Sequence, residues 1–130
     1  MTTWNEHVAT QCTPEQLAEA ERAADLAMTR FPDLRGGGFV GEGALRTDPW
    51  GLVQIATSLA FLRRCTATAT PRYSAFELKC VIERSEQYVC NGAVIAAAAF
   101  LGLPMRRFHY GALIGVTRRS VQDACREESA

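Results

Sequence analysis

Length, composition and charge set the first limits on the 130-residue chain. It is 48% hydrophobic and its formal net charge is zero. This length and hydrophobic content predict one folded domain over residues 1–130 and exclude a disordered protein or a global polycation. The charge is uneven, because residues 1–50 hold eight acids and four bases, whereas residues 105–130 hold three acids and five bases. The two regions can attract each other or face different partners.

Two amphipathic helices are predicted in the first half of the chain. Thr13 and Gln16 form a capping box around Pro14, and small apolar residues then recur at helical spacing as far as Phe31. A connection with five glycines between Phe31 and Asp48 is unlike a helix. Asp48 then caps a second predicted helix, which ends near Arg63.

Three further helices are predicted in the second half. Ser74 and Glu77 open one of them, and another begins near Asn91 and runs through an apolar, alanine-rich body that should be buried on most sides, including Ile95 and Phe100. Gly102 and Pro104 end it with a left-handed cap. The last helix is predicted from about residue 117 to 127.

The predicted fold class is therefore mainly α, with about five helices. Residues 105–117 are open to two interpretations, a further helix or a short β wing. Gly111 and Gly115 weaken the helical interpretation by about 1 kcal/mol each.

Five cysteines without a C-x-x-C pair favour reduced thiols. The N-terminus lacks the pattern of a secretory signal, and no apolar stretch reaches the roughly 18 residues that span a bilayer. We therefore expect a cytoplasmic protein that does not enter membranes. Whether it acts as a monomer or a homodimer is left open.

Catalytic chemistry finds no support in the sequence. The glycine-rich loop 36–43 lacks the ending of a phosphate-binding loop, and its role is left open. Cys90 precedes a helix, whose amides can activate a thiol, but no base is placed beside it. Cys80, Cys90 and His109 would make an incomplete zinc site. We expect no catalytic residue, no metal and no cofactor, and hence no enzyme.

Residues 92–116 have the order of a helix-turn-helix unit, with a small residue, a glycine turn and then a basic segment. In this hypothesis Phe108 and Ala112 pack inward while the polar residues of the second helix read double-stranded DNA. Two arginines near residue 118 would neutralise phosphates. The predicted nucleic-acid-binding residues are Arg106, Arg107, His109, Tyr110, Arg118 and Arg119.

A pattern over residues 73–104 resembles a motif of small uncharacterised proteins carried by plasmids, phages and other mobile elements. The residues that carry it are Tyr73, Ser74, Leu78, Lys79, Glu83, Tyr88, Val89, Asn91, Gly92, Ile95, Ala96, Ala97 and Gly102. The resemblance implies an accessory protein of a mobile element, which would act by binding DNA or a host protein.

The alternative hypothesis is a protein-binding inhibitor of a host defence complex, for example an anti-CRISPR protein. Carboxylates on its surface would imitate phosphates and occupy a basic nucleic-acid channel. The residues predicted for this role are Glu15, Glu19, Asp25 and Glu42.

Overall fold

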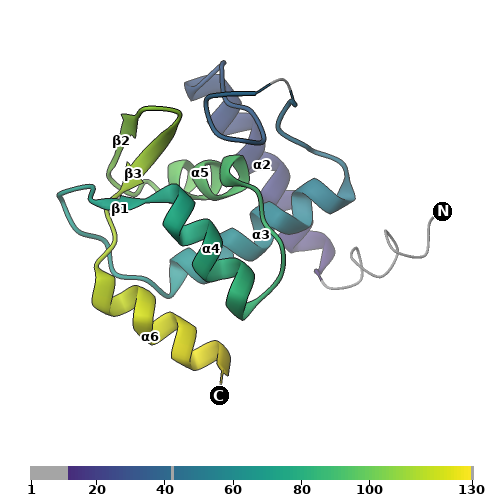
Figure 1. Ribbon diagram of the computed structural model, residues 1–130. Helices are drawn as coiled ribbons and strands as arrows, with labels where there is room; N and C mark the ends of the chain where they lie inside the picture. The colour runs from purple at the N-terminus through teal and green to yellow at the C-terminus, as the bar shows by residue number, and fades with distance from the viewer. Residues whose placement is uncertain (1–11, 42, 130) are drawn as a thin grey trace.

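The computed structural model describes residues 12–41 and 43–129, which form five helices and a three-stranded antiparallel sheet (Figure 1). The number of helices agrees with the prediction, but the chain combines α and β structure and is not all-α. The elements in chain order are α2 (Pro14–Arg30), α3 (Pro49–Arg63), β1 (Tyr73–Ser74), α4 (Ala75–Ser85), α5 (Asn91–Phe100), β2 (Met105–Phe108), β3 (Gly111–Ile114) and α6 (Arg118–Ser129).

Helix α5 is the centre of the fold. It packs against α2, α3 and α4, and every residue from 92 to 99 is buried. Its many alanines let neighbouring helices approach closely, and the facing stripe of α2 is likewise made of buried alanines. Ile95 is completely buried as predicted, whereas Phe100 at the last turn is only half-buried.

The predicted helix starts are confirmed by their hydrogen bonds. Thr13 Oγ1 accepts from the Gln16 amide at 3.1 Å, and the Thr13 amide donates back to Gln16 Oε1 at 2.8 Å. Asp48 Oδ1 accepts from the Gly51 amide at 3.0 Å, and the Ser74 hydroxyl accepts from two amides of α4. Local sequence therefore fixes where these three helices begin.

The two ends of α5 differ in how well they were predicted. The residue that caps its start is Cys90, whose sulfur accepts from the Ala93 amide, so the cap lies one residue before the predicted Asn91. The end is as expected: Gly102 has φ +70°, and its amide donates to the Ala99 carbonyl. Leu103 donates to the Ala98 carbonyl, which completes the left-handed cap.

Residues 105–114 form a β-hairpin, which decides between the two interpretations left open by the sequence. Strand β3 lies between β2 and β1. Ile114 of β3 is opposite Met105 on β2 and opposite Tyr73 on β1. The turn contains His109 at φ +54°, a conformation that interrupts a helix. The predicted helix-turn-helix unit at 92–116 is therefore wrong, because no second helix follows the turn at Gly102.

The glycine-rich loop after α2 packs against the start of α5 and the hairpin. The Gly92 amide donates to the Gly36 carbonyl at 2.8 Å, and the Phe39 amide donates to the Tyr110 carbonyl at 2.7 Å. A Cβ atom on Gly92 would lie 2.1 Å from the Arg35 carbonyl oxygen, so this contact requires glycine. The loop, whose role the sequence left open, thus joins α5 to the hairpin.

Ile95→Ala should lower the free energy of unfolding by about 2–5 kcal/mol, because it leaves a cavity in the helix at the centre of the fold. Leu26→Ala, on the solvent side of α2 where the side chain is 43% exposed, is the control and should change it by no more than about 0.5 kcal/mol. Urea denaturation measures both. Equal unfolding midpoints for Ile95→Ala and the wild type would contradict the central role of α5.

Gly92→Ala should destabilise the protein by about 1–3 kcal/mol or more, because the added methyl group collides with the backbone at Arg35. Gly43→Ala is a matched control, since a Cβ atom there meets no other atom within 4 Å. Thermal unfolding of the two variants tests the contact. If both variants melted at the same temperature, the loop would not be packed on α5 as described.

Candidate nucleic-acid interface

The two arginines predicted to lead a DNA-reading helix instead lie on strand β2 and point to opposite faces of the sheet. Arg107 is paired with the buried Ala112, and Arg106 is paired with Leu113. Side chains of successive strand residues alternate between faces. Arg107 therefore shares the face of the sheet turned toward the core, and Arg106 occupies the other face, so the two cannot reach one groove together as on a helix.

Arg107 joins the hairpin to the loop after α2. Its guanidinium donates to both carboxylate oxygens of Asp33, at 2.7 and 3.3 Å, and stacks on the Phe39 ring at 3.7 Å. The hydrogen bonds from Arg107 hold the pKa of Asp33 below its ordinary value. The positive charge of Arg107, which was predicted to contact nucleic acid, is therefore already paired with the Asp33 carboxylate.

The tip of the hairpin is exposed. Phe108, expected to pack inward, is 49% exposed and meets the His109 ring edge-on, with centroids 4.2 Å apart. Tyr110 is 67% exposed, and its carbonyl accepts the bond from Phe39. Ala112 is buried as predicted. His109 and Tyr110 thus remain accessible, but at the end of a turn and away from α6.

A hollow of about 540 Å³ lies where α6 begins, beside β1. It forms because the segment before β1 pairs with the segment after β3: Thr68 donates to the Gly115 carbonyl, and Thr117 donates to the Thr66 carbonyl. We call it the basic hollow. Its lining residues are Thr68, Thr70, Arg72, Tyr73, Val116, Thr117 and Arg118.

The lining of the basic hollow favours an anion. It contains two arginines and three threonine hydroxyls but no carboxylate. The positive end of the α6 dipole lies there too, since Thr117 Oγ1 accepts from the Ser120 amide in the first turn. Within the described part of the chain neither Arg72 nor Arg118 forms an ion pair, and Arg119 approaches Asp123 only at 3.8 Å.

Tyr73 adds a hydroxyl donor to the basic hollow. The residue as a whole is only 8% exposed, and the Arg118 guanidinium lies 5.2 Å from its ring centroid. A tyrosine hydroxyl is protonated at neutral pH and can donate a hydrogen bond, and burial raises the pKa of Tyr73 further above its ordinary value. No described residue forms a hydrogen bond with that hydroxyl, which leaves it for a ligand oxygen.

Of the predicted nucleic-acid residues, Arg118 lines the basic hollow, and Arg119 is the next residue of α6 but does not line it. The structure does not bring Arg106, Arg107, His109 and Tyr110 into one surface with them. Sequence reasoning missed Arg72 and Tyr73. The threonine-rich segment that precedes them was the available signal, but its pairing across to residues 115–117 is a long-range contact that no local pattern predicts.

The alternative acidic surface is only partly present. Glu15 and Asp25 are exposed on α2, but Arg63 binds both oxygens of Glu19 at 2.6 and 2.7 Å and holds the pKa of Glu19 below its ordinary value. Glu42 lies outside the described residues. Because Glu19 is already paired, α2 does not present the continuous negative surface that a phosphate mimic needs.

Comparison with known proteins adds nothing to this geometry. Searches of protein-family models, curated proteins and solved structures find no significant match to the chain. The resemblance over residues 73–104 therefore stays a prediction.

Among the residues described, no group of three or more His, Cys, Asp and Glu side chains is placed to hold a metal ion. No helix in that part of the chain is long and apolar enough to cross a membrane.

The five cysteines are half-buried thiols that form no disulfide with one another. Burial raises the pKa of Cys65 to about 11. Burial also raises the pKa of Cys90, and the backbone amides at the start of α5 offset this only in part. The thiolate is the reactive form, so the position of Cys90 before a helix does not make it an activated nucleophile.

Native alkylation should therefore spare Cys65 and Cys90 at mildly alkaline pH. Both should react more slowly than the same residues in denatured protein, and the rate at Cys65 should rise as the pH approaches its pKa of about 11. Peptide mass mapping after timed iodoacetamide treatment measures this. Rapid native modification of Cys90 would contradict the dominant effect of burial on that thiol.

Proposed function

We propose that the protein is a non-catalytic nucleic-acid-binding protein that holds double-stranded DNA through the phosphates at the basic hollow. The observation that carries the proposal is the composition of this hollow, which gathers Arg72, Arg118 and the hydroxyl of Tyr73 at a helix N-terminus without a carboxylate. Guanidinium groups, hydroxyls and helix N-termini are the groups that proteins use to bind DNA phosphates.

This mode of binding differs from the helix-turn-helix hypothesis in what it recognises. Phosphate contacts fix position on a duplex but carry no direct sequence information. Arg72 and Arg118 would hold one phosphate, and Arg119 in the next position of α6 would reach a neighbouring one. The expected binding is salt-dependent and tolerant of sequence. It suits the accessory role in a mobile element that the resemblance over residues 73–104 implies.

The structure favours this proposal over a protein-binding inhibitor that imitates DNA. The basic hollow leaves two guanidinium groups without an ion-pair partner among the described residues, whereas Glu19 on α2 is held by Arg63. An inhibitor of this kind needs its carboxylates available, because each pair already formed must break before the charge can be used.

Replacing Arg118 and Arg119 together by alanine should weaken binding to a fluorescein-labelled random duplex. It should also flatten the plot of log K against log salt by about 0.9 per lost contact. The matched control is the double alanine variant of Arg22 and Arg30 on α2, which removes the same charge from a different surface. Fluorescence anisotropy at several salt concentrations measures both variants.

Arg72→Ala should weaken binding in the same way. Arg107→Ala should instead lower stability through loss of its pair with Asp33 and leave the salt slope unchanged. Absence of binding by the wild type at low ionic strength would refute the proposal. So would equal losses in the Arg118/Arg119 and Arg22/Arg30 variants, since net charge alone would then account for the affinity.

A further inference from the structure

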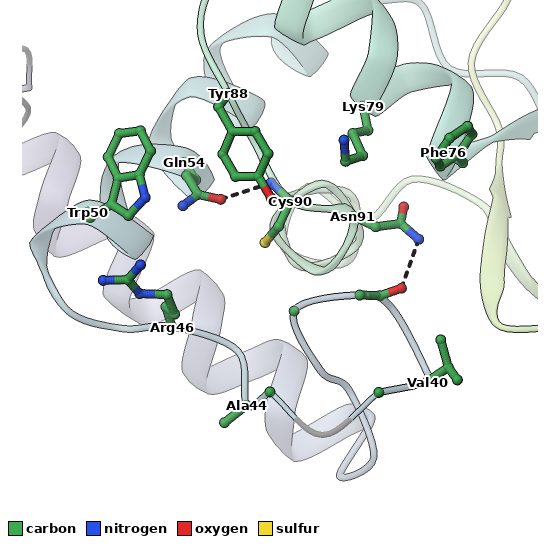
Figure 2. A pocket seen from close by; sticks show the side chains of 14 residues that line it. Val40, Ala44, Arg46, Trp50, Gln54, Phe76, Lys79, Tyr88, Cys90 and Asn91 are labelled. Carbon is green, nitrogen blue, oxygen red and sulfur yellow. Dashed lines mark hydrogen bonds between the residues drawn. The ribbon is translucent and has the colours of Figure 1, made fainter.

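A second hollow, of about 500 Å³, lies between the glycine-rich loop and the starts of α3 and α5 (Figure 2). It is separate from the basic hollow and shares no lining residue with it. We call it the aromatic pocket. Its described lining residues are Gly36, Gly37, Val40, Gly41, Gly43, Ala44, Arg46, Trp50, Gln54, Phe76, Lys79, Tyr88, Cys90 and Asn91.

Three aromatic side chains line the aromatic pocket. The rings of Trp50 and Tyr88 are nearly parallel, with an angle of 19° between their planes and 6.4 Å between their centroids. Tyr88 is 52% exposed and Phe76 is 61% exposed, although both are large apolar groups. The exposed rings of Tyr88 and Phe76 are surfaces on which a planar ligand can stack.

Gln54 supplies a buried amide to the same pocket. The residue is only 2% exposed, and its Oε1 accepts from the Cys90 amide at 2.8 Å. That bond fixes the orientation of the side chain, which Figure 2 shows with its nitrogen turned away from Cys90. No described residue accepts a hydrogen bond from Gln54 Nε2. Gln54 lines the pocket, so an acceptor on a ligand can take a hydrogen bond from this nitrogen.

Asn91 holds the glycine-rich loop at the edge of the pocket. Its Nδ2 donates to the Gly37 carbonyl at 3.3 Å, and its Oδ1 is buried and out of reach of a ligand (Figure 2). The pocket thus offers a ligand one amide donor, from Gln54, beside aromatic rings. Nucleobases carry hydrogen-bond acceptors on a flat framework, which matches this arrangement.

Two basic side chains stand at the opening of the pocket. Lys79 Nζ lies 5.3 Å from the centroid of the Tyr88 ring, and Arg46 lies at the other side of the opening. Glu83 and Asp48 pair with these two cations, but neither carboxylate lines the pocket. An anionic group that enters would therefore compete with Glu83 and Asp48 for the two cations, and partly exposed ion pairs of this kind are weak.

We propose that the aromatic pocket binds a nucleoside monophosphate. The base stacks on the exposed Tyr88 ring and accepts a hydrogen bond from Gln54 Nε2, and the phosphate lies toward Lys79 and Arg46, where it competes with Glu83 and Asp48. The volume is within the range of about 300–1,000 Å³ that is usual for small-molecule sites. This site does not depend on DNA binding at the basic hollow, and either one can exist without the other.

The fluorescence of Trp50 gives a direct test. A Trp4→Phe background leaves Trp50 as the sole tryptophan. Adenosine, guanosine, cytidine and uridine 5′-monophosphates are titrated in turn, with ribose 5-phosphate and inorganic phosphate as probes that lack a base. At least one nucleotide should quench the fluorescence saturably and raise the melting temperature, whereas the two base-free probes should do neither.

Variants then locate the bound nucleotide. Tyr88→Ala should weaken binding by roughly 5- to 150-fold, the usual effect of losing one stacking partner. Tyr110→Ala is the matched control, because that tyrosine is 67% exposed but lies on the hairpin outside the pocket. Lys79→Gln should weaken the nucleotide more than the corresponding nucleoside, and Arg84→Gln on the same helix should affect neither.

Three outcomes would overturn the proposal. The first is the absence of saturable quenching by every nucleotide at millimolar concentration. The second is equal affinity of the Tyr88→Ala and Tyr110→Ala variants. The third is quenching by a short single-stranded oligonucleotide but by none of the mononucleotides, which would assign the pocket to a base within a strand rather than to a free nucleotide.

Discussion

The close approach of the glycine-rich loop to the first turn of α5 is the contact on which the arrangement of the molecule depends. At Gly92 the backbone of α5 and the backbone at Arg35 are so near that there is no room for a Cβ atom. The same loop binds the hairpin through the Phe39 amide and through the pair between Asp33 and Arg107. One connection thus fixes three parts of the chain relative to one another: α2, α5 and the hairpin.

Both hollows are products of long-range contacts around α5 and the sheet. The aromatic pocket exists because the loop stands against α5 opposite Phe76, in the first turn of α4, and Tyr88, which follows the end of α4. The basic hollow exists because residues 66–68 pair with residues 115–117 across the edge of the sheet. Asp33 in the acidic N-terminal region and Arg107 in the basic C-terminal region form an ion pair, so part of the uneven charge is neutralised within the fold.

Features that depend on local chemistry could be predicted from the sequence. The caps at Thr13, Asp48 and Ser74, the buried alanine helix and the left-handed Gly102 are each encoded within a few residues. The hairpin was predicted only as one of two alternatives, because its pairing with Tyr73 and its contact with Phe39 lie far away in sequence. The pair between Arg107 and Asp33 was not predicted for the same reason, since the two residues are distant along the chain.

The candidate sites were predicted less well than the helices. Arg118 and Arg119 were identified from their charge, but Arg72 and Tyr73 join them only through the pairing of β1 with β3. Gln54 gave no signal at all, because a glutamine within an apolar helix is indistinguishable from a surface residue until the helix is found to be buried on nearly every side. Periodicity identifies which residues are helical, but it does not show which polar groups are left without partners in the interior.

The central position of α5 also bears on how the chain folds during translation. Helices α2 and α3 contact each other but complete their burial only against α5, which is synthesised later. Until then the alanine stripe of α2 and the apolar faces of α3 have no cover, and such exposed surfaces promote aggregation. The caps at Thr13 and Asp48 favour the helical state of these two segments by about 1 kcal/mol each, so most of their stability depends on a single partner that is made late.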